Sequence, residues 1–295
     1  NRMKAFIEYA EKNWTGMTED RTKVVTALDM LEKAKAAVTP DSVYAKRIAE
    51  IAEYCRPLKD LKIQLAKRKE RSDVPLLRYS KVSPDDVKID GKLDDTVWKG
   101  HLAPGQVHLP YQSRGLLKDL KSGEAPAYTS RFLVARVGDD LVFAVKCMDG
   151  TETLNVTAHE DDDINIWSGD CIELLIETQN HSYYQIAVAP SGAVVDLYRE
   201  DGINLKWSCG GEVATRIAED YWSAEIRLPL PRGDMQAIVD PRNGLEGYPP
   251  TENFPWYINL CCARIRGEKT ELSAYSPTET DNFHNVMAFA RFHAK

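Results

Sequence analysis

The sequence has no apolar run long enough to cross a membrane, and its first residues lack the pattern of a signal peptide. A membrane-spanning helix needs roughly 18 apolar residues in succession, so we expect no membrane insertion. The chain starts at Asn1-Arg2-Met3-Lys4, already inside an amphipathic pattern. We therefore expect it to be a piece of a larger protein, whose export a missing leader does not exclude.

Catalytic signatures are also missing. The sequence contains no glycine-rich phosphate loop, no G-x-S-x-G and no H-E-x-x-H, and no Ser–His–Asp set can be assembled. Its six cysteines show neither zinc-ligand nor disulfide-framework spacing. We expect no enzymatic activity from this chain, and we expect the cysteines to be small apolar core residues, with a disulfide left open.

Charge is divided unevenly along the chain. Residues 1–80 hold 17 Lys/Arg and 12 Asp/Glu, a net charge of +5, and the remaining 21 and 33 give residues 81–295 a net charge of −12. This shift indicates a change of domain near residue 80. An acidic second domain repels phosphate backbones, so we expect no nucleic-acid partner.

Helical periodicity dominates the first part. The pattern predicts helices over 3–13, 19–38 and 42–70, with Val24, Leu28 and Leu31 on one face of the second and a kink or break at Pro57. We expect about three helices in residues 1–71, followed by a linker over 72–85.

From residue 86 to 295 the period changes from 3.6 to 2. Strands are predicted over 87–90, 130–137, 140–148, 170–177, 183–189, 193–198, 212–218, 221–228, 256–266, 271–275 and 286–292. Two long loops, 101–129 and 229–255, separate some of them. The fold class expected is therefore α+β multidomain, with a helical segment before an antiparallel, jelly-roll-like β-sandwich.

An ordered set of motifs in this second part carries a resemblance. It opens with Ile89-Asp90-Gly91-Lys92-Leu93-Asp94 followed by Trp98, continues with Trp167-Ser168-Gly169-Asp170 and Glu173, and ends with Tyr221-Trp222-Ser223-Ala224-Glu225. Together these resemble the family 9 carbohydrate-binding modules and the wider DOMON-like sandwiches. The helical part is similar to the region behind the barrel of some large bacterial glycoside-hydrolase-like proteins.

The resemblance implies a non-catalytic module at the C-terminus of a secreted, periplasmic or cell-surface bacterial protein. Its partners would be a polysaccharide or oligosaccharide and the catalytic domain of the same parent chain. The alternative is a structural accessory domain that buttresses the catalytic domain and binds no sugar.

Trp167 is the first candidate for a sugar contact, because an exposed indole matches the flat C–H face of a sugar ring. The other interpretation is a partly buried plug at one end of the sandwich. Asp170 and Glu173 lie three residues apart on a strand, so they point to opposite faces and are not a glycosidase pair. We expect one of them to contact sugar and the other to pair with an arginine or the backbone.

The chain departs from the sugar-binding members of the family. Ala187 and Ala189 stand where those modules have an arginine and an asparagine, and Cys261 stands where they have a glutamine. The second stacking tryptophan is absent from 277–281. If the chain binds a glycan, it binds in another way or weakly.

Three further residues complete the set of candidate ligand contacts. Arg264 could read two hydroxyls or a uronic-acid carboxylate, or could form a structural salt bridge. His284 could reach the same end of the sandwich or order its own loop. Tyr184 is a further candidate for a sugar contact.

We expect no cofactor, with Ca²⁺ left open. Asp149, Asp161 and Asp163 could hold this ion, which prefers several oxygen ligands, although the spacing of a dedicated calcium loop is missing. A solvated acidic surface is the other interpretation. A haem site through Met148 and His181 or His284 has no attachment motif to support it.

Overall fold

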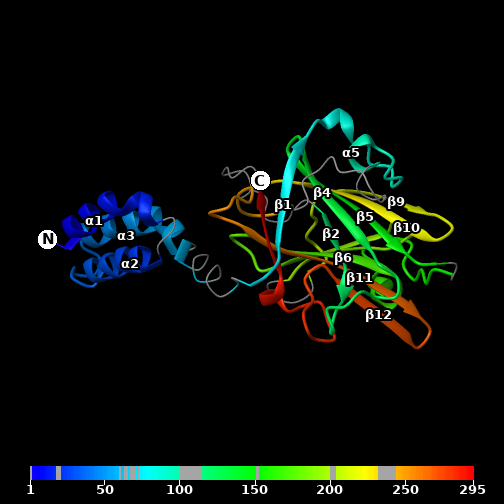
Figure 1. The fold of residues 1–295 in the computed structure, drawn as a ribbon. Coiled ribbons are helices and arrows are strands. Elements are labelled where there is room, and N and C mark those ends of the chain that lie inside the picture. The colour runs from blue at the N-terminus through cyan, green and yellow to red at the C-terminus, as the bar shows by residue number, and fades with distance from the viewer. Residues whose placement is uncertain are drawn as a thin grey trace. The chain divides into compact units, whose positions relative to one another are not determined.

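The computed structural model describes residues 2–17, 21–59, 61, 62, 66, 71, 73–99, 114–150, 153–199, 204–231 and 244–295. The chain divides into two compact units, Asn1–Asp73 and Val74–Lys295. Helices make up the first unit and strands dominate the second (Figure 1), which confirms the expected fold class.

The first unit contains α1 (Arg2–Met17), α2 (Arg21–Lys35) and α3 (Val43–Tyr54). The buried residues of α2 recur at helical spacing: Val24, Ala27, Leu31 and Ala34. Ser42 caps α3 by accepting a hydrogen bond from the backbone N–H of Ala45. Among the described residues, no helix is both long and apolar enough to span a bilayer.

The helix expected over 42–70 is shorter than predicted. α3 ends at Tyr54 with Cys55 as its C-cap, and helical geometry resumes at 56–59. Pro57 has no backbone N–H to donate to the carbonyl four residues earlier, so the helix cannot run unbroken through this segment, and the break falls at Cys55. Residues 60, 63–65 and 67–70 of that prediction lie outside the described residues.

The second unit is built mainly from short strands. Their bounds are β1 (Leu76–Val82), β2 (Arg114–Leu116), β3 (Lys118–Asp119), β4 (Arg131–Val137), β5 (Asp140–Met148), β6 (Cys171–Glu177), β7 (Tyr184–Val188), β8 (Val194–Tyr198), β9 (Glu212–Ile217), β10 (Tyr221–Pro229), β11 (Trp256–Arg266), β12 (Lys269–Ala274) and β13 (Ala290–Ala294). Short helices lie between some of them: η1 (Pro84–Asp86), α5 (Thr96–Lys99), η3 (Ile164–Ser168) and η5 (Val286–Ala288).

These strands form the two layers of a sandwich. Strand order runs β8-β7-β6-β11-β13-β1-β4-β5-β10-β9, so β6, β7, β8, β11 and β13 form one layer and β4, β5, β9 and β10 form the other. The pairs within each layer are antiparallel, whereas β1 pairs in parallel with β13 and with β4 and thereby joins the layers (Figure 1). The predicted β-sandwich is confirmed, with one parallel strand added.

Strand β1 corrects the prediction of a linker over 72–85. Leu77 and Tyr79 are 0% and 2% exposed, and the residues beside them are half-buried. This alternation is the signal of a strand, and Pro75 and Pro84 at its two ends concealed it. The short strands β2 and β3 also lie inside a segment expected to be a loop.

The interior lies between the two layers. Leu174 of β6 and Leu260 of β11 pack in one apolar cluster with Phe143 of β5 and Ile226 of β10. The outer face of β6 is covered as well, so every residue of this strand is buried. Two-sided burial explains why this strand is apolar on both faces at five of its seven positions, with Glu173 and Glu177 as the buried exceptions.

The opening motif covers the outer face of the second layer. Residues 87–90 were predicted to be a strand and are not one. Instead, the backbone N–H groups of Asp90 and Gly91 donate to Glu225 Oε2 at 2.9 and 2.8 Å. Because a side chain satisfies these donors, the segment needs no partner strand.

Candidate functional site

The outer face of the β6–β7–β11 layer gathers most of the predicted ligand residues. On β11, Cys261 lies directly opposite Glu173 of β6, and Ala187 of β7 lies opposite Glu173 on its other side. Residues opposite one another in an antiparallel pair share a face. Glu173 is therefore the central polar group of this face, with Ala187 and Cys261 as its neighbours.

A loop brings Trp167 to the same face. Asp163 caps η3 by accepting a hydrogen bond from the backbone N–H of Asn165 at 3.0 Å, which fixes the short helix that carries the indole. Trp167 is half-buried and packs against the apolar cluster of this face. Trp167 thus shares features of both interpretations made from the sequence. It packs into the end of the sandwich like a plug, and part of the residue stays accessible to a ligand.

The Glu173 carboxyl is buried, with 4% of the residue exposed. Burial raises its pKa to about 7, and the hydrogen bond from Gln185 and the charge of Arg199 only partly oppose this shift. Gln185 Nε2 donates to Glu173 Oε2 at 2.5 Å. A carboxyl with this pKa exchanges its proton near neutral pH and can either donate or accept a hydrogen bond.

Two buried polar atoms beside Glu173 lack ordinary hydrogen-bond partners among the described residues. They are Gln185 Oε1 and Trp167 Nε1. The indole N–H is nevertheless close enough to the Glu173 carboxylate to favour its charged form. Buried polar atoms without a partner are uncommon in folded proteins, and Gln185 Oε1 is the one that no neighbouring group in the described part of the chain satisfies here.

Tyr183 and His284 extend the site at its rim. The Tyr183 hydroxyl lies 2.8 Å from His284 Nδ1, and Arg199 lies over the Tyr183 ring, 6.0 Å from its centroid. Partial burial and the charge of Arg199 lower the pKa of His284, which keeps it neutral at pH 7. His284 thus reaches this face through its contact with Tyr183.

Sequence reasoning missed Gln185, Tyr183 and Arg199. The available signal was the period of 2, because Tyr183 and Gln185 flank Tyr184 and so point to the other side of β7. Arg199 follows β8 and bonds from its backbone N–H to Tyr183 O at 3.1 Å. Its role depends on the pairing of β7 with β8, which the local pattern does not show.

Three positions at which this sequence departs from the family 9 pattern are apolar and buried. Ala187, Ala189 and Cys261 are at most 1% exposed. Phe283 and Phe289 pack onto the same cluster from the loop that would carry the second tryptophan. Aromatic side chains of the chain itself are thus part of the apolar cluster on this face.

Tyr184 and Arg264 do not belong to this face. Tyr184 points between the layers, stacks on Trp207 with the ring centroids 4.6 Å apart, and accepts a hydrogen bond from Glu246 N. Arg264 pairs with Asp149 and lies over the Tyr128 ring at 4.0 Å. These contacts favour a structural salt bridge, and not a sugar contact, as the role of Arg264.

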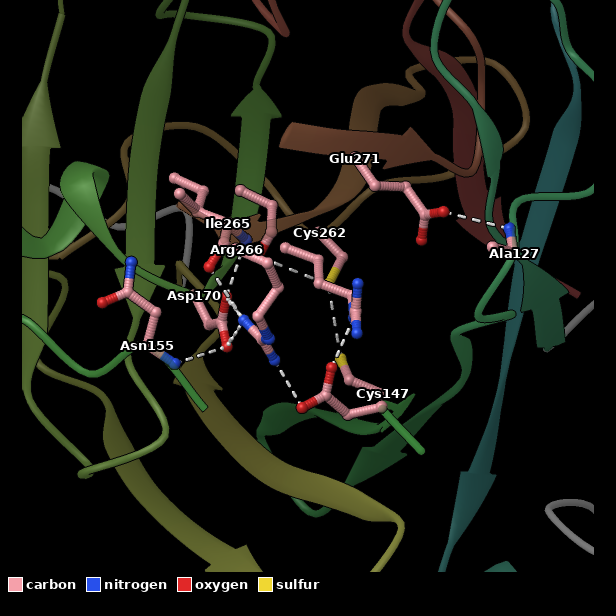
Figure 2. A network of polar contacts seen from close by, with 11 residues as sticks. Ala127, Cys147, Asn155, Asp170, Cys262, Ile265, Arg266 and Glu271 are labelled. Carbon is pink, nitrogen blue, oxygen red and sulfur yellow. Dashed lines mark hydrogen bonds and ion pairs between the residues drawn. The ribbon is translucent and has the colours of Figure 1, made fainter. Parts of the chain in front are cut away.

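Asp170 and Arg266 form a buried ion pair at the end of the sandwich (Figure 2). Asp170 also accepts hydrogen bonds from the backbone N–H groups of Ile265 at 2.8 Å and Asn155 at 3.0 Å. Arg266 pairs with Asp149 as well. Asp170 is thus the structural member of the pair predicted from the sequence, and Glu173 is the candidate for sugar contact.

The three aspartates proposed as calcium ligands are engaged separately. Asp149 pairs with arginines, Asp163 caps η3, and Asp161 Oδ1 accepts from Val194 N at 2.9 Å. The described residues include no cluster of three or more His, Cys, Asp or Glu suited to a metal ion. The structure does not bring these three carboxylates together.

Comparison with known proteins bears on the fold. A protein from Bacteroides uniformis ATCC 8492 described as carbohydrate-binding matches with a TM-score of 0.53 and 11% identity over 75% of this chain and 99% of that chain. A family 9 carbohydrate-binding module from Caldicellulosiruptor kristjanssonii, solved with cellotriose, gives a TM-score of 0.49 and 13% identity over 74% and 93%. No family profile and no curated protein matches. The first likeness shows that this chain shares its fold with that protein.

Proposed function

We propose that the second unit is a non-catalytic carbohydrate-binding module, whose ligand is a segment of polysaccharide or an oligosaccharide. The observation that carries this proposal is the half-buried Trp167 ring beside the buried Glu173 carboxyl and the unsatisfied Gln185 Oε1. Both the fold and its neighbour from Bacteroides uniformis support it.

In this site, Trp167 supplies an apolar surface and Glu173 with Gln185 supplies hydrogen bonds. Covering roughly 50–60 Å² of the indole would contribute about 1.5 kcal/mol. Glu173 can donate or accept, which suits a sugar hydroxyl, since a hydroxyl can do both. His284 and Tyr183 would limit how far the ligand extends.

The parent protein is proposed to be a secreted or cell-surface, glycoside-hydrolase-like enzyme whose catalytic domain precedes this chain. In that arrangement the module holds the enzyme on its substrate, and avidity raises the local substrate concentration. Export and this partner follow from the resemblance of the motifs and domain order.

A structural accessory role is the second candidate. The closed positions Ala187, Ala189 and Cys261, together with the packing of Phe283 and Phe289, favour it. In that role the sandwich buttresses a neighbouring domain, and the face around Glu173 is an ordinary apolar surface under two loops.

Affinity electrophoresis separates the two roles. The chain is run through gels that contain plant or mucin polysaccharides, and Trp167→Ala is compared with Trp14→Ala. Trp14 is 63% exposed in the helical unit, so its substitution controls for the loss of any exposed indole.

If the module binds sugar, the polysaccharide retards the unsubstituted chain. Trp167→Ala should then lower the affinity measured from this retardation about tenfold, and Trp14→Ala should leave it unchanged. No retardation on any polysaccharide, or equal loss in both variants, would leave the accessory role. Release of soluble sugar by the chain would overturn the assignment as non-catalytic.

A further inference from the structure

Two buried cysteines meet between the layers of the sandwich. Cys147 belongs to β5 in one layer and Cys262 to β11 in the other, and their Sγ atoms lie 3.7 Å apart (Figure 2). Cys147 is 1% exposed and Cys262 is 6% exposed. The contact therefore joins the two layers directly, at residues 115 positions apart in the chain.

The other cysteines have different surroundings. Cys261 precedes Cys262 on β11 and so points to the opposite face, where Cys171 sits diagonally from it across the β6–β11 pair. Such diagonal positions are roughly 7–8 Å apart, beyond the Cβ separation of a disulfide. Cys55 lies in the helical unit and Cys209 beside Asp196.

We propose that Cys147 and Cys262 form an inter-layer disulfide when the chain folds in an oxidising compartment. From 3.7 Å, the sulfurs need to approach by about 1.7 Å to reach bonding distance. A cavity of about 10 Å³, lined by both residues, adjoins them. It leaves space for the side chains to rotate as the sulfurs approach.

The bond forms by thiol–disulfide exchange with a small disulfide such as oxidised glutathione. The thiolate of one cysteine attacks the donor, which forms a mixed disulfide and releases one glutathione thiol. The second cysteine then attacks the protein-bound sulfur and releases the second glutathione. The two thiol protons are transferred to the two glutathione thiolates, so one donor disulfide is reduced for each protein disulfide formed.

The exchange takes place before the layers close. Burial raises the pKa of Cys147 well above its ordinary value, so little reactive thiolate exists in the folded state. The adjoining cavity is about the size of one water molecule, which excludes a glutathione molecule. Oxidation is therefore coupled to folding and depends on the compartment in which folding occurs.

Refolding under a set redox potential tests the proposal. The reduced, unfolded chain is refolded with mixtures of reduced and oxidised glutathione, its free thiols are alkylated after denaturation, and its peptides are mapped by mass spectrometry. The expected product is a linked peptide pair that contains Cys147 and Cys262, with the other four of the six cysteines alkylated.

Melting temperature gives a second, independent measurement. A bond that closes a loop of this length restricts the unfolded chain, so the oxidised protein should melt several degrees above the reduced one. The double variant Cys147→Ala with Cys262→Ala should show no redox dependence, whereas the control Cys209→Ala, also at a buried cysteine, should keep it.

Alkylation of all six cysteines after oxidative refolding would overturn the proposal, as would a linkage between other cysteines. If the double variant does not fold, the peptide map of the unsubstituted chain still decides. The result is independent of sugar binding, because Cys262 and Glu173 point to opposite faces of the same layer.

Discussion

Glu225 Oε1 accepts a hydrogen bond from the indole Nε1–H of Trp98 at 2.8 Å, across 127 residues of sequence. Its second oxygen accepts from the backbone N–H groups of Asp90 and Gly91. One buried carboxyl on β10 thus holds both ends of the opening motif. The motif that suggested a sugar-binding family is, in this chain, a structural clamp on the outer face of the second layer.

Substitution of Glu225 should destabilise the second unit strongly. Glu225→Ala leaves three donors without an acceptor in a site where the residue is 0% exposed, at a cost of about 3–5 kcal/mol. Urea unfolding followed by tryptophan fluorescence measures the loss. Glu212→Gln, on an exposed part of β9, should change the free energy of unfolding by less than about 1 kcal/mol.

Gly91→Ala should also destabilise the clamp, for a steric reason. Gly91 has φ +75°, and a Cβ there would lie 2.6 Å from the carbonyl carbon of Thr215, a backbone atom that cannot move aside. Gly267 has φ +59° with nothing within 4 Å of the same Cβ. Thermal melts should therefore show a larger fall in Tm for Gly91→Ala than for Gly267→Ala, which pays only the cost of its backbone conformation. Equal falls would contradict the close approach.

The Glu173 carboxyl should make stability depend on pH. Its pKa rises from 4.5 when exposed to about 7 in the folded chain, so the folded state binds a proton more tightly. The resulting stabilisation is complete below pH 4.5 and is lost as the pH rises through 7. The difference of about 2.5 units corresponds to about 3 kcal/mol.

Glu173→Gln removes this titration and should flatten the decline between pH 4.5 and 7. Free energies of unfolding at four or five pH values across this window measure it, with Glu160→Gln, an exposed position, as the control. A variant whose profile parallels that of the unsubstituted chain would show that Glu173 does not titrate in this range.

The Asp170–Arg266 pair should contribute far more than an exposed pair. Asp170→Ala leaves Arg266 short of one counter-charge and removes the acceptor of two backbone N–H groups, so a loss of about 3–5 kcal/mol is expected. Asp139→Ala breaks the pair with Arg136, in which the Asp139 side chain is 75% exposed, and should cost about 0–1 kcal/mol. Chemical denaturation measures both free energies of unfolding. Similar losses for the two variants would show that the buried ion pair is worth no more than the exposed one.

Local sequence patterns predicted most elements because their physical basis is local. The recurrence of Val24, Leu28 and Leu31 indicates a helix from local spacing alone. The short apolar runs of β4 and β5, separated by a turn at Gly138-Asp139, indicate two strands in the same way. Strand β1 was missed because its two prolines are typical of a linker. Residues 87–90 were wrongly assigned because their backbone partner, Glu225, lies far along the chain.

By itself, the sequence determined the order of helices and strands, the change of character near residue 80 and the candidate indole at 167. Only the tertiary structure decided which residues share a face. It separated Tyr184 and Arg264 from Trp167, joined Tyr183 and Gln185 to Glu173, and brought Cys147 against Cys262. The physical reason is that strand pairing sets register over long sequence separations, and a shift of one residue exchanges the two faces of a strand.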